Sequence, residues 1–225
     1  DIIEIGGEST RPGAEPVAAD QELARIAPVI EALAGRITIP IAVDTCKGEV
    51  ARHAVRLGAS LVNDVSALRF DPAIARVSAE SGAGLVLMHM RGNPSIMQKL
   101  PASDDVFREI ELDLSAAVQT AENAGVIRDQ LILDPGIGFG KTAQQNLAII
   151  NHLERVLRIG FPVMVGTSRK KFIGALTGKA EHERVFGTAA TVAAAILRGA
   201  HLVRVHDVEA MIDVVKLADA IAQAP

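Results

Sequence analysis

The sequence has 225 residues, a length that fits one large domain or two small ones. A net charge of −4, the absence of Trp and Tyr, and only 6 Phe argue against nucleic-acid binding, since the chain offers neither an overall basic field nor many stacking rings. No apolar run approaches membrane-spanning length, and the single cysteine, Cys46, cannot form an internal disulfide. We therefore expect a cytoplasmic protein that binds neither nucleic acid nor membranes.

Seven short apolar runs recur along the chain, and each ends in polar residues. In order they are DIIEIGGEST at 1–10, IPIAVDT at 39–45, ASLVNDVS at 59–66, GLVLMHM at 84–90, QLILDPG at 130–136, PVMVGTSRK at 162–170 and HLVRVHD at 201–207. Most are continuously apolar rather than alternating, which indicates parallel strands buried on both faces.

Helical spacing of apolar residues predicts a helix after each strand. The predicted ranges are 21–34, 48–57, 72–81, 106–124, 144–159, 183–198 and 208–223. Gly35 is the expected stop of the first helix, and Asp71-Pro72 and Asp207 are expected helix starts. Alternating strands and helices indicate a parallel sheet.

The predicted fold is a (β/α)8 TIM barrel formed by one domain, 1–225. Barrels typically take about 250 residues, and a doubly wound open sheet is the alternative. Seven β–α units are one short of eight, and the chain opens inside a strand. We therefore expect the first β–α unit to be missing at the N-terminus.

The strand tips carry two kinds of polar side chain. Acceptors occur at Asp44, Asn63 and Asp134, and they suit the N–H edge of a polar heterocycle. Donors that suit phosphate oxygens occur at Thr10, Arg11, Ser168, Lys170, Arg204 and His206. Because a barrel gathers its strand tips at one mouth, we expect a single site for a ligand with a heterocycle at one end and phosphate at the other.

Structural roles are open alternatives for several of these residues. Asp44 and Asp134, taken singly, are as consistent with helix N-caps as with ligand contacts. Asp64 and Asp207 are expected to be caps or supporting groups. His89, between two methionines, is expected to pack in the barrel.

The stretch LDPGIGFGKT at 133–142 resembles a phosphate-binding loop, GxxxxGK[ST], only in its second half. The position of its first glycine is Pro135, which has no N–H to offer a phosphate. We expect Lys141 to be a surface or helix-start residue rather than a phosphate ligand.

Seven motifs together resemble the dihydropteroate synthase family. They are GGESTRPGA at 6–14, VDT at 43–45, ND at 63–64, LMHMRGNP at 87–94, LDPGIGFGK at 133–141, TSRKKFIG at 167–174 and RVHD at 204–207. The resemblance implies a transferase of folate biosynthesis that joins p-aminobenzoate to hydroxymethyl-dihydropterin diphosphate and releases diphosphate.

The resemblance also implies a role for individual residues. The pterin-binding residues are Asp44, Asn63, Asp134, Lys170, Met88 and Gly166. The diphosphate-binding residues are Thr10, Arg11, Arg204 and His206. The p-aminobenzoate site, which sulfonamides occupy in the family, is bordered by Pro12, Phe139, Ser168 and Lys170. The residues expected to assist the departure of diphosphate are Arg204, His206, Lys170 and Arg11.

Mg²⁺ is expected with the diphosphate by resemblance alone. Its protein ligand in the family lies before GGESTRP, so no metal-binding residue is assigned. The family also implies a homodimer formed through late helices, while packing of the small-residue helix at 187–199 against its own barrel is equally consistent with the sequence. Two other functions stay open: a corrinoid-linked methyltransferase that binds methyl-tetrahydrofolate, and an inactive pterin-binding barrel.

Overall fold

The computed structural model describes residues 1–11 and 13–225, and its seven strands follow one another in chain order. They are β1 Ile3–Gly6, β2 Ile41–Asp44, β3 Leu61–Asp64, β4 Gly84–Met88, β5 Leu131–Asp134, β6 Met164–Val165 and β7 Leu202–Val203. All pairings are parallel between consecutive strands, and a bridge from Leu133 to Val163 joins the first five strands to the last two. This sequential order is that of a barrel wall and excludes the reversed order of a doubly wound sheet.

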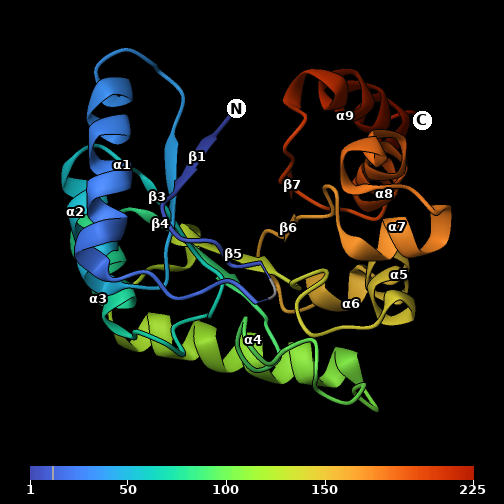
Figure 1. Ribbon diagram of the computed structural model, residues 1–225, viewed down its shortest axis with the longest axis horizontal. Coiled ribbons are helices and arrows are strands. Elements are labelled where there is room, and N and C mark those ends of the chain that lie inside the picture. The colour runs from blue at the N-terminus through green and yellow to red at the C-terminus, as the bar shows by residue number, and fades with distance from the viewer. Residues whose placement is uncertain (12) are drawn as a thin grey trace.

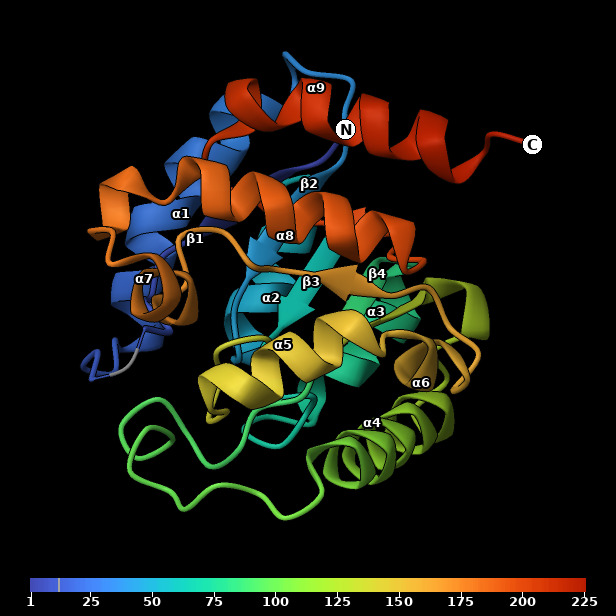
Figure 2. The same ribbon diagram turned by 90° about the vertical axis from the view of Figure 1, so that its right-hand side faces the viewer.

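The helices cover the outside of the strands. They are α1 Ala19–Ala34, α2 Gly48–Arg56, α3 Ala73–Ser81, α4 Val106–Asn123, α5 Ala143–Asn151, α6 Glu154–Leu157, α7 Lys171–Thr177, α8 Val185–Leu197 and α9 Val208–Ala222. Figure 1 shows α1 to α3 on one side of the strands, α4 below them and α5 to α9 on the other side, and Figure 2 turns this last group toward the viewer. Within the described ranges, no helix is long and apolar enough to cross a membrane.

Six of the seven predicted helices agree with the structure to within two residues at each end. The prediction of one helix over 144–159 is wrong. The backbone leaves helical geometry at His152, and a short second helix, α6, follows. The sequence also missed α7, because seven residues are too few to display a helical period.

The strands alternate between an inner face and a helix-covered face. An apolar layer inside the barrel consists of Ala42, Leu61, Val86, Ile132, Met164 and Leu202, one residue from each of β2 to β7. Positions of opposite parity, such as Val43, Leu85 and Leu133, pack in the larger core beneath the helices. Full burial of side chains of this size stabilises the fold by about 1.5–3 kcal/mol each. The inner layer forms the floor of the cavity described next, and we call it the floor layer.

Candidate active site

The polar site stands one step above the floor layer. Two residues further along each strand of the floor layer come Asp44, Asn63, Met88, Asp134, Gly166 and Arg204. Because side chains two apart share a face of a strand, these residues project into the same space. They line one cavity of about 680 Å³, together with Thr10, Arg11, Phe139, Ser168, Lys170 and His206. The expectation of one shared site is confirmed for the described residues, and Pro12 lies outside them.

Asp44 and Asn63 both line the cavity, and each has one buried oxygen that accepts no hydrogen bond from the described residues. Oδ1 of Asp44 and Oδ1 of Asn63 are buried and accept no hydrogen bond within the described part of the chain. Asp44 does not cap a helix, because the N-cap of α2 is Lys47. Buried acceptors without donors are costly, by about 1–3 kcal/mol each. A ligand that brings N–H donors to this wall would remove that cost.

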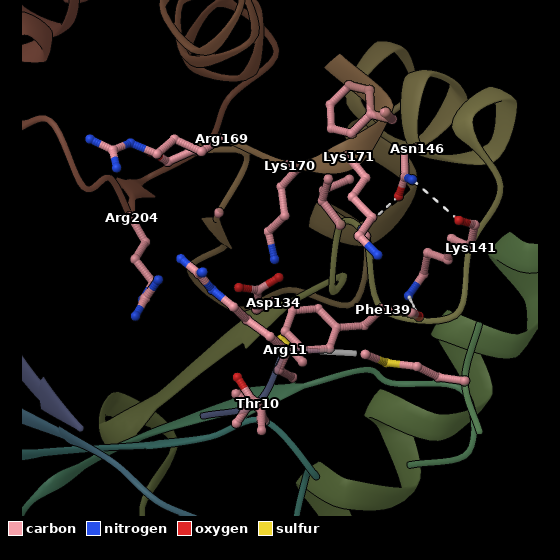
Figure 3. Close-up of a pocket in the computed structure, with 18 of the residues that line it drawn as sticks. Thr10, Arg11, Asp134, Phe139, Lys141, Asn146, Arg169, Lys170, Lys171 and Arg204 are labelled. Carbon is pink, nitrogen blue, oxygen red and sulfur yellow. Dashed lines mark hydrogen bonds between the residues drawn. The ribbon is translucent and has the colours of Figure 1, made fainter. Parts of the chain in front are cut away.

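Asp134 and Lys170 occupy the opposite part of the wall, and Figure 3 shows their side chains pointing toward each other. One oxygen of Asp134 accepts the N–H of Gly136 at 2.6 Å, so the side chain closes its own turn, while Thr142 caps α5. Burial raises the pKa of Asp134 to about 6 and lowers the pKa of Lys170 to about 8. Nζ of Lys170 also lies 4.1 Å from the ring centre of Phe139, within cation–π range.

The anion-binding candidates come from three strand ends. Oγ of Ser168 accepts the backbone N–H of His206 at 3.1 Å and lies 3.0 Å from its Nδ1, which joins the loops after β6 and β7. Arg11 is largely exposed at the rim of the cavity, where it pairs with Glu181 at 3.1 Å. Burial, followed by the Arg204 charge, lowers the pKa of His206, while Arg204 itself keeps a raised pKa because of Glu4.

The prediction for Lys141 is correct in one part, because the residue directly precedes Thr142, the N-cap of α5, and wrong in the other, because its side chain is buried and does not lie on the surface. Its Nζ donates to the carbonyl oxygens of Gly136 at 2.9 Å, Phe139 at 3.2 Å and His89 at 3.3 Å. The ammonium group therefore fastens the glycine turn to the backbone after β4. Burial lowers its pKa to about 7.

The glycine at 136 is required by this close approach. Its φ is +67°, and a Cβ there would lie 1.8 Å from the carbonyl oxygen of His89. The side chain of Asn146 holds the next part of the turn by accepting the N–H of Gly138 at 2.8 Å. Together these contacts carry Phe139 to the cavity wall (Figure 3).

Arg169 is a site residue that the sequence reasoning passed over. It is a non-glycine residue with φ +58°, between the two cavity residues Ser168 and Lys170. Its N–H bonds Thr188, its carbonyl accepts from Arg184 at 2.9 Å, and its guanidinium pairs with Asp207. Strained conformations of this kind persist where the surroundings over-determine them.

The expected supporting roles are confirmed for Asp64 and His89. Asp64 is buried and accepts the backbone N–H groups of Ser66 at 2.8 Å and Leu68 at 2.6 Å. His89 is buried under α4, with its Nε2 3.4 Å from Asp113. Asp207 is the N-cap residue of α9, although its side chain bonds Arg169 and not the helix.

Glu4 is a second missed residue, and the sequence contained a signal for it. It is an acidic residue flanked by Ile3 and Ile5, in a strand otherwise apolar up to Gly6. Its carboxylate accepts from Asn63 at 2.8 Å and from Nε of Arg204 at 2.6 Å. The fold therefore links a heterocycle-binding candidate to an anion-binding candidate through one side chain.

Comparison with known proteins identifies the family to which a cavity of this kind belongs. The model of the pterin binding enzyme family matches residues 1–206. The chain is 50% identical over 221 residues to the dihydropteroate synthase of Synechocystis, covering 98% of this chain and 76% of the relative. It is 41% identical to the Escherichia coli dihydropteroate synthase, covering 99% of this chain and 79% of the relative.

The chain belongs to the dihydropteroate synthase family. A solved Yersinia pestis dihydropteroate synthase in complex with a sulfonamide drug superposes with a TM-score of 0.95 at 38% identity, covering 99% of this chain and 81% of that one. A Xanthomonas albilineans dihydropteroate synthase with 4-aminobenzoic acid superposes at 0.93 with 43% identity, covering 100% and 80%. The TIM-barrel prediction is confirmed, and the dihydropteroate synthase assignment makes the chain a transferase.

Proposed function

We propose that the cavity joins the amine of p-aminobenzoate to the methylene carbon of hydroxymethyl-dihydropterin diphosphate, giving dihydropteroate and diphosphate. The observation that carries this proposal is the meeting of two kinds of group in one cavity. Asp44 and Asn63 each have a buried oxygen that accepts no hydrogen bond from the residues that the structure describes, and cationic side chains lie at Lys170 and Arg204. The oxygens suit the N–H edge of a pterin, and the cations suit the oxygens of diphosphate.

The reaction does not require a strong base. The C–O bond between methylene and diphosphate breaks with its electron pair leaving on diphosphate, and the reduced pterin ring donates electrons to the carbon left behind. The aromatic amine is already neutral at pH 7, so it forms the C–N bond without prior deprotonation and then loses a proton to water. Catalysis of this SN1-like substitution consists mainly of holding the ring and compensating the leaving charge. We assign the compensation to Arg204, His206, Lys170 and Arg11.

The p-aminobenzoate site is proposed along Phe139, Ser168 and Lys170. The family pattern also assigns Pro12 to this site, and that residue lies outside the described ones. The ring of Phe139 and the methylene stem of Lys170 offer an apolar wall, and the Ser168 hydroxyl offers a polar end. We expect sulfonamides to compete with p-aminobenzoate here. The sulfonamide bound to the Yersinia pestis relative supports that expectation by similarity.

Further parts of the proposal concern the metal, the assembly and the compartment. We propose, from the family resemblance, that Mg²⁺ arrives on the diphosphate. Residues 1–11 and 13–225 contain no cluster of three His, Cys, Asp or Glu suited to a metal. We propose a homodimer through α8 and α9, whose exposed apolar residues include Phe186, Leu217 and Ile221. Gly187 itself lies against Ile173 of α7, so the small-residue stripe serves packing within the chain in part. A cytoplasmic location suits the free thiol of Cys46.

The test is a pair of substitutions with opposite expected effects. Arg204→Ala should lower kcat by on the order of 10²–10³-fold, as the loss of a charge-stabilising donor does. Its affinity for hydroxymethyl-dihydropterin without diphosphate should fall by less than about tenfold, or about 1.4 kcal/mol. Asp134→Asn should instead weaken binding of that pterin more strongly, because an amide replaces an acceptor by a donor. Equal losses of pterin affinity and kcat in both variants would refute this division of roles.

The reaction itself is tested by adding both substrates and measuring dihydropteroate and inorganic diphosphate. The methyltransferase alternative releases no diphosphate, and the inactive-barrel alternative binds pterin without turnover. Formation of both products in equal amounts supports the proposed reaction, and pterin binding without either product contradicts it.

A further inference from the structure

The side chain of Glu4 breaks the pattern of the floor layer. By strand register, Glu4 pairs with Ala42, and the other residues of that layer on β3 to β7 are all apolar. The Glu4 side chain is 18% exposed, and a partly buried carboxylate of this kind is stabilised by hydrogen bonds and opposite charge. Packing of the barrel interior does not require an acid at this position, so we take the role of Glu4 from the residues that it contacts.

The two oxygens of Glu4 serve two different parts of the cavity. Oε1 receives both Nε and Nη2 of Arg204, at 2.6 and 2.5 Å. Oε2 accepts Nδ2 of Asn63 at 2.8 Å. Nη2 of Arg204 is also 3.8 Å from Asp44, so two carboxylates face this guanidinium.

The bond to Asn63 fixes how its amide is turned. With Nδ2 held by a carboxylate, Oδ1 has to point the other way, and Oδ1 is the buried oxygen that has no hydrogen-bond partner in residues 1–11 and 13–225. A free amide could turn over and present donors to the N–H edge of the ligand, which would be a mismatch. Glu4 therefore selects the acceptor face of Asn63.

The bond to Arg204 has the opposite consequence for an anion. The Nε and Nη2 edge is the fork that binds two oxygens of a carboxylate or phosphate side by side, and Glu4 already occupies it. A diphosphate must either displace Glu4 from this edge or bind the remaining edge beside its negative charge. Both routes weaken the bound diphosphate.

We propose that Glu4 is a positioning residue with two roles: it sets the orientation of Asn63 for the heterocycle, and it competes with diphosphate for Arg204 so that the diphosphate product is released. This inference rests on the proposed function, because it assigns the two ligand halves to the two ends of Glu4. After the diphosphate leaves, the Glu4 carboxylate takes its place as the negatively charged partner of Arg204.

Two variants separate the roles. Glu4→Gln keeps an oxygen that can accept from Asn63 but removes the charge. Glu4→Met removes both at similar length. By titration calorimetry we expect Glu4→Gln to bind inorganic diphosphate more tightly, by on the order of tenfold for the loss of one nearby negative charge, and to bind hydroxymethyl-dihydropterin as the parent does. Glu4→Met should also gain diphosphate affinity but lose pterin affinity.

Steady-state kinetics gives a readout that a merely structural role would not move. In Glu4→Gln, the inhibition constant of added diphosphate should fall by the same factor as its dissociation constant. An exposed acid on α1, Glu31, supplies the matched control Glu31→Gln, which should change neither value. Unchanged or weaker diphosphate binding in Glu4→Gln overturns the competition, and this variant decides alone if Glu4→Met does not fold. If the parent protein binds neither ligand, the proposed function fails; if it binds both and Glu4→Gln matches it, only this inference fails.

Discussion

Replacement of Lys141 by methionine tests whether a buried ammonium group holds the glycine turn. Its Nζ donates to the carbonyl oxygens of His89, Gly136 and Phe139, and burial lowers its pKa to about 7 from 10.5. Methionine has similar length and no charge. The substitution therefore removes three stabilising hydrogen bonds and, at the same time, the free-energy cost of burying the ammonium group. Net hydrogen bonds to charged groups contribute about 1.5–3 kcal/mol each, and burial of the charge offsets a large part of that. We expect Lys141→Met to lower the free energy of unfolding by about 2 kcal/mol at pH 7.

The pH dependence of the free energy of unfolding gives a second, more specific magnitude. The folded-state pKa is lowered, so above about pH 7 the unfolded chain binds more protons at this residue than the folded one, and parent stability rises with pH. One pH unit corresponds to at most about 1.4 kcal/mol per group. Between pH 7 and 8.5 the parent should therefore gain up to about 2 kcal/mol that Lys141→Met does not gain. Below about pH 6 the difference between the two proteins should be constant.

Urea unfolding at pH 6, 7 and 8.5 measures this difference. Lys99 is exposed, so Lys99→Met serves as the matched control and should change the free energy of unfolding by less than about 0.5 kcal/mol. If Lys141→Met and the parent differ by the same amount at all three pH values, Nζ is not desolvated in the folded protein. Lys141 would then not hold the glycine turn as a buried ammonium group.

Three other predictions follow from the site. Because burial raises the pKa of Asp134 to about 6 and lowers that of Lys170 to about 8, kcat/KM for the pterin diphosphate should rise through pH 6 and fall above pH 8; a flat profile from pH 5 to 9.5 would contradict these shifts. Gly136→Ala should lower the thermal midpoint far more than Gly178→Ala, since both have positive φ but only the first places a Cβ against the His89 carbonyl; equal shifts in a calorimetric scan would argue against the close approach. Asp207→Asn should raise KM for p-aminobenzoate several-fold, because the ion pair of Asp207 with Arg169 shapes the loop carrying Ser168 and Lys170; an unchanged KM would show that this pair does not position the loop.

The sequence was sufficient for the strands and for most of the cavity wall, and the reason is local. Buried parallel strands have a continuous apolar signature, and a polar residue at such a strand's end, as at Asp44 or Asp134, stands out against it. A period of two then places each one above the floor layer without knowledge of the rest of the fold.

Lys141 could not be placed in this way. One of the carbonyl oxygens that hold it belongs to His89, more than fifty residues earlier in the chain, and only the assembled barrel brings the two together. Arg169 is similar, because its positive φ is imposed by Thr188 and Arg184 of a later segment. Glu4 lies between these cases: its alternation with Ile3 and Ile5 indicated an inward acid, whereas its partners came from β3 and the end of β7.

The floor layer and the site above it are two consequences of one strand geometry. Apolar side chains such as Val86 and Met164 exclude water beneath the cavity, and that exclusion desolvates the polar side chains two residues further on. The same burial that moves the pKa of Asp134 upward moves that of Lys170 downward, so each charged form is less favoured here than in water. A ligand with N–H donors favours the ionised acid, and a ligand with anionic oxygens favours the protonated amine. A molecule that carries both at a fixed distance therefore stabilises both charged forms at once, whereas either half alone stabilises only one of them.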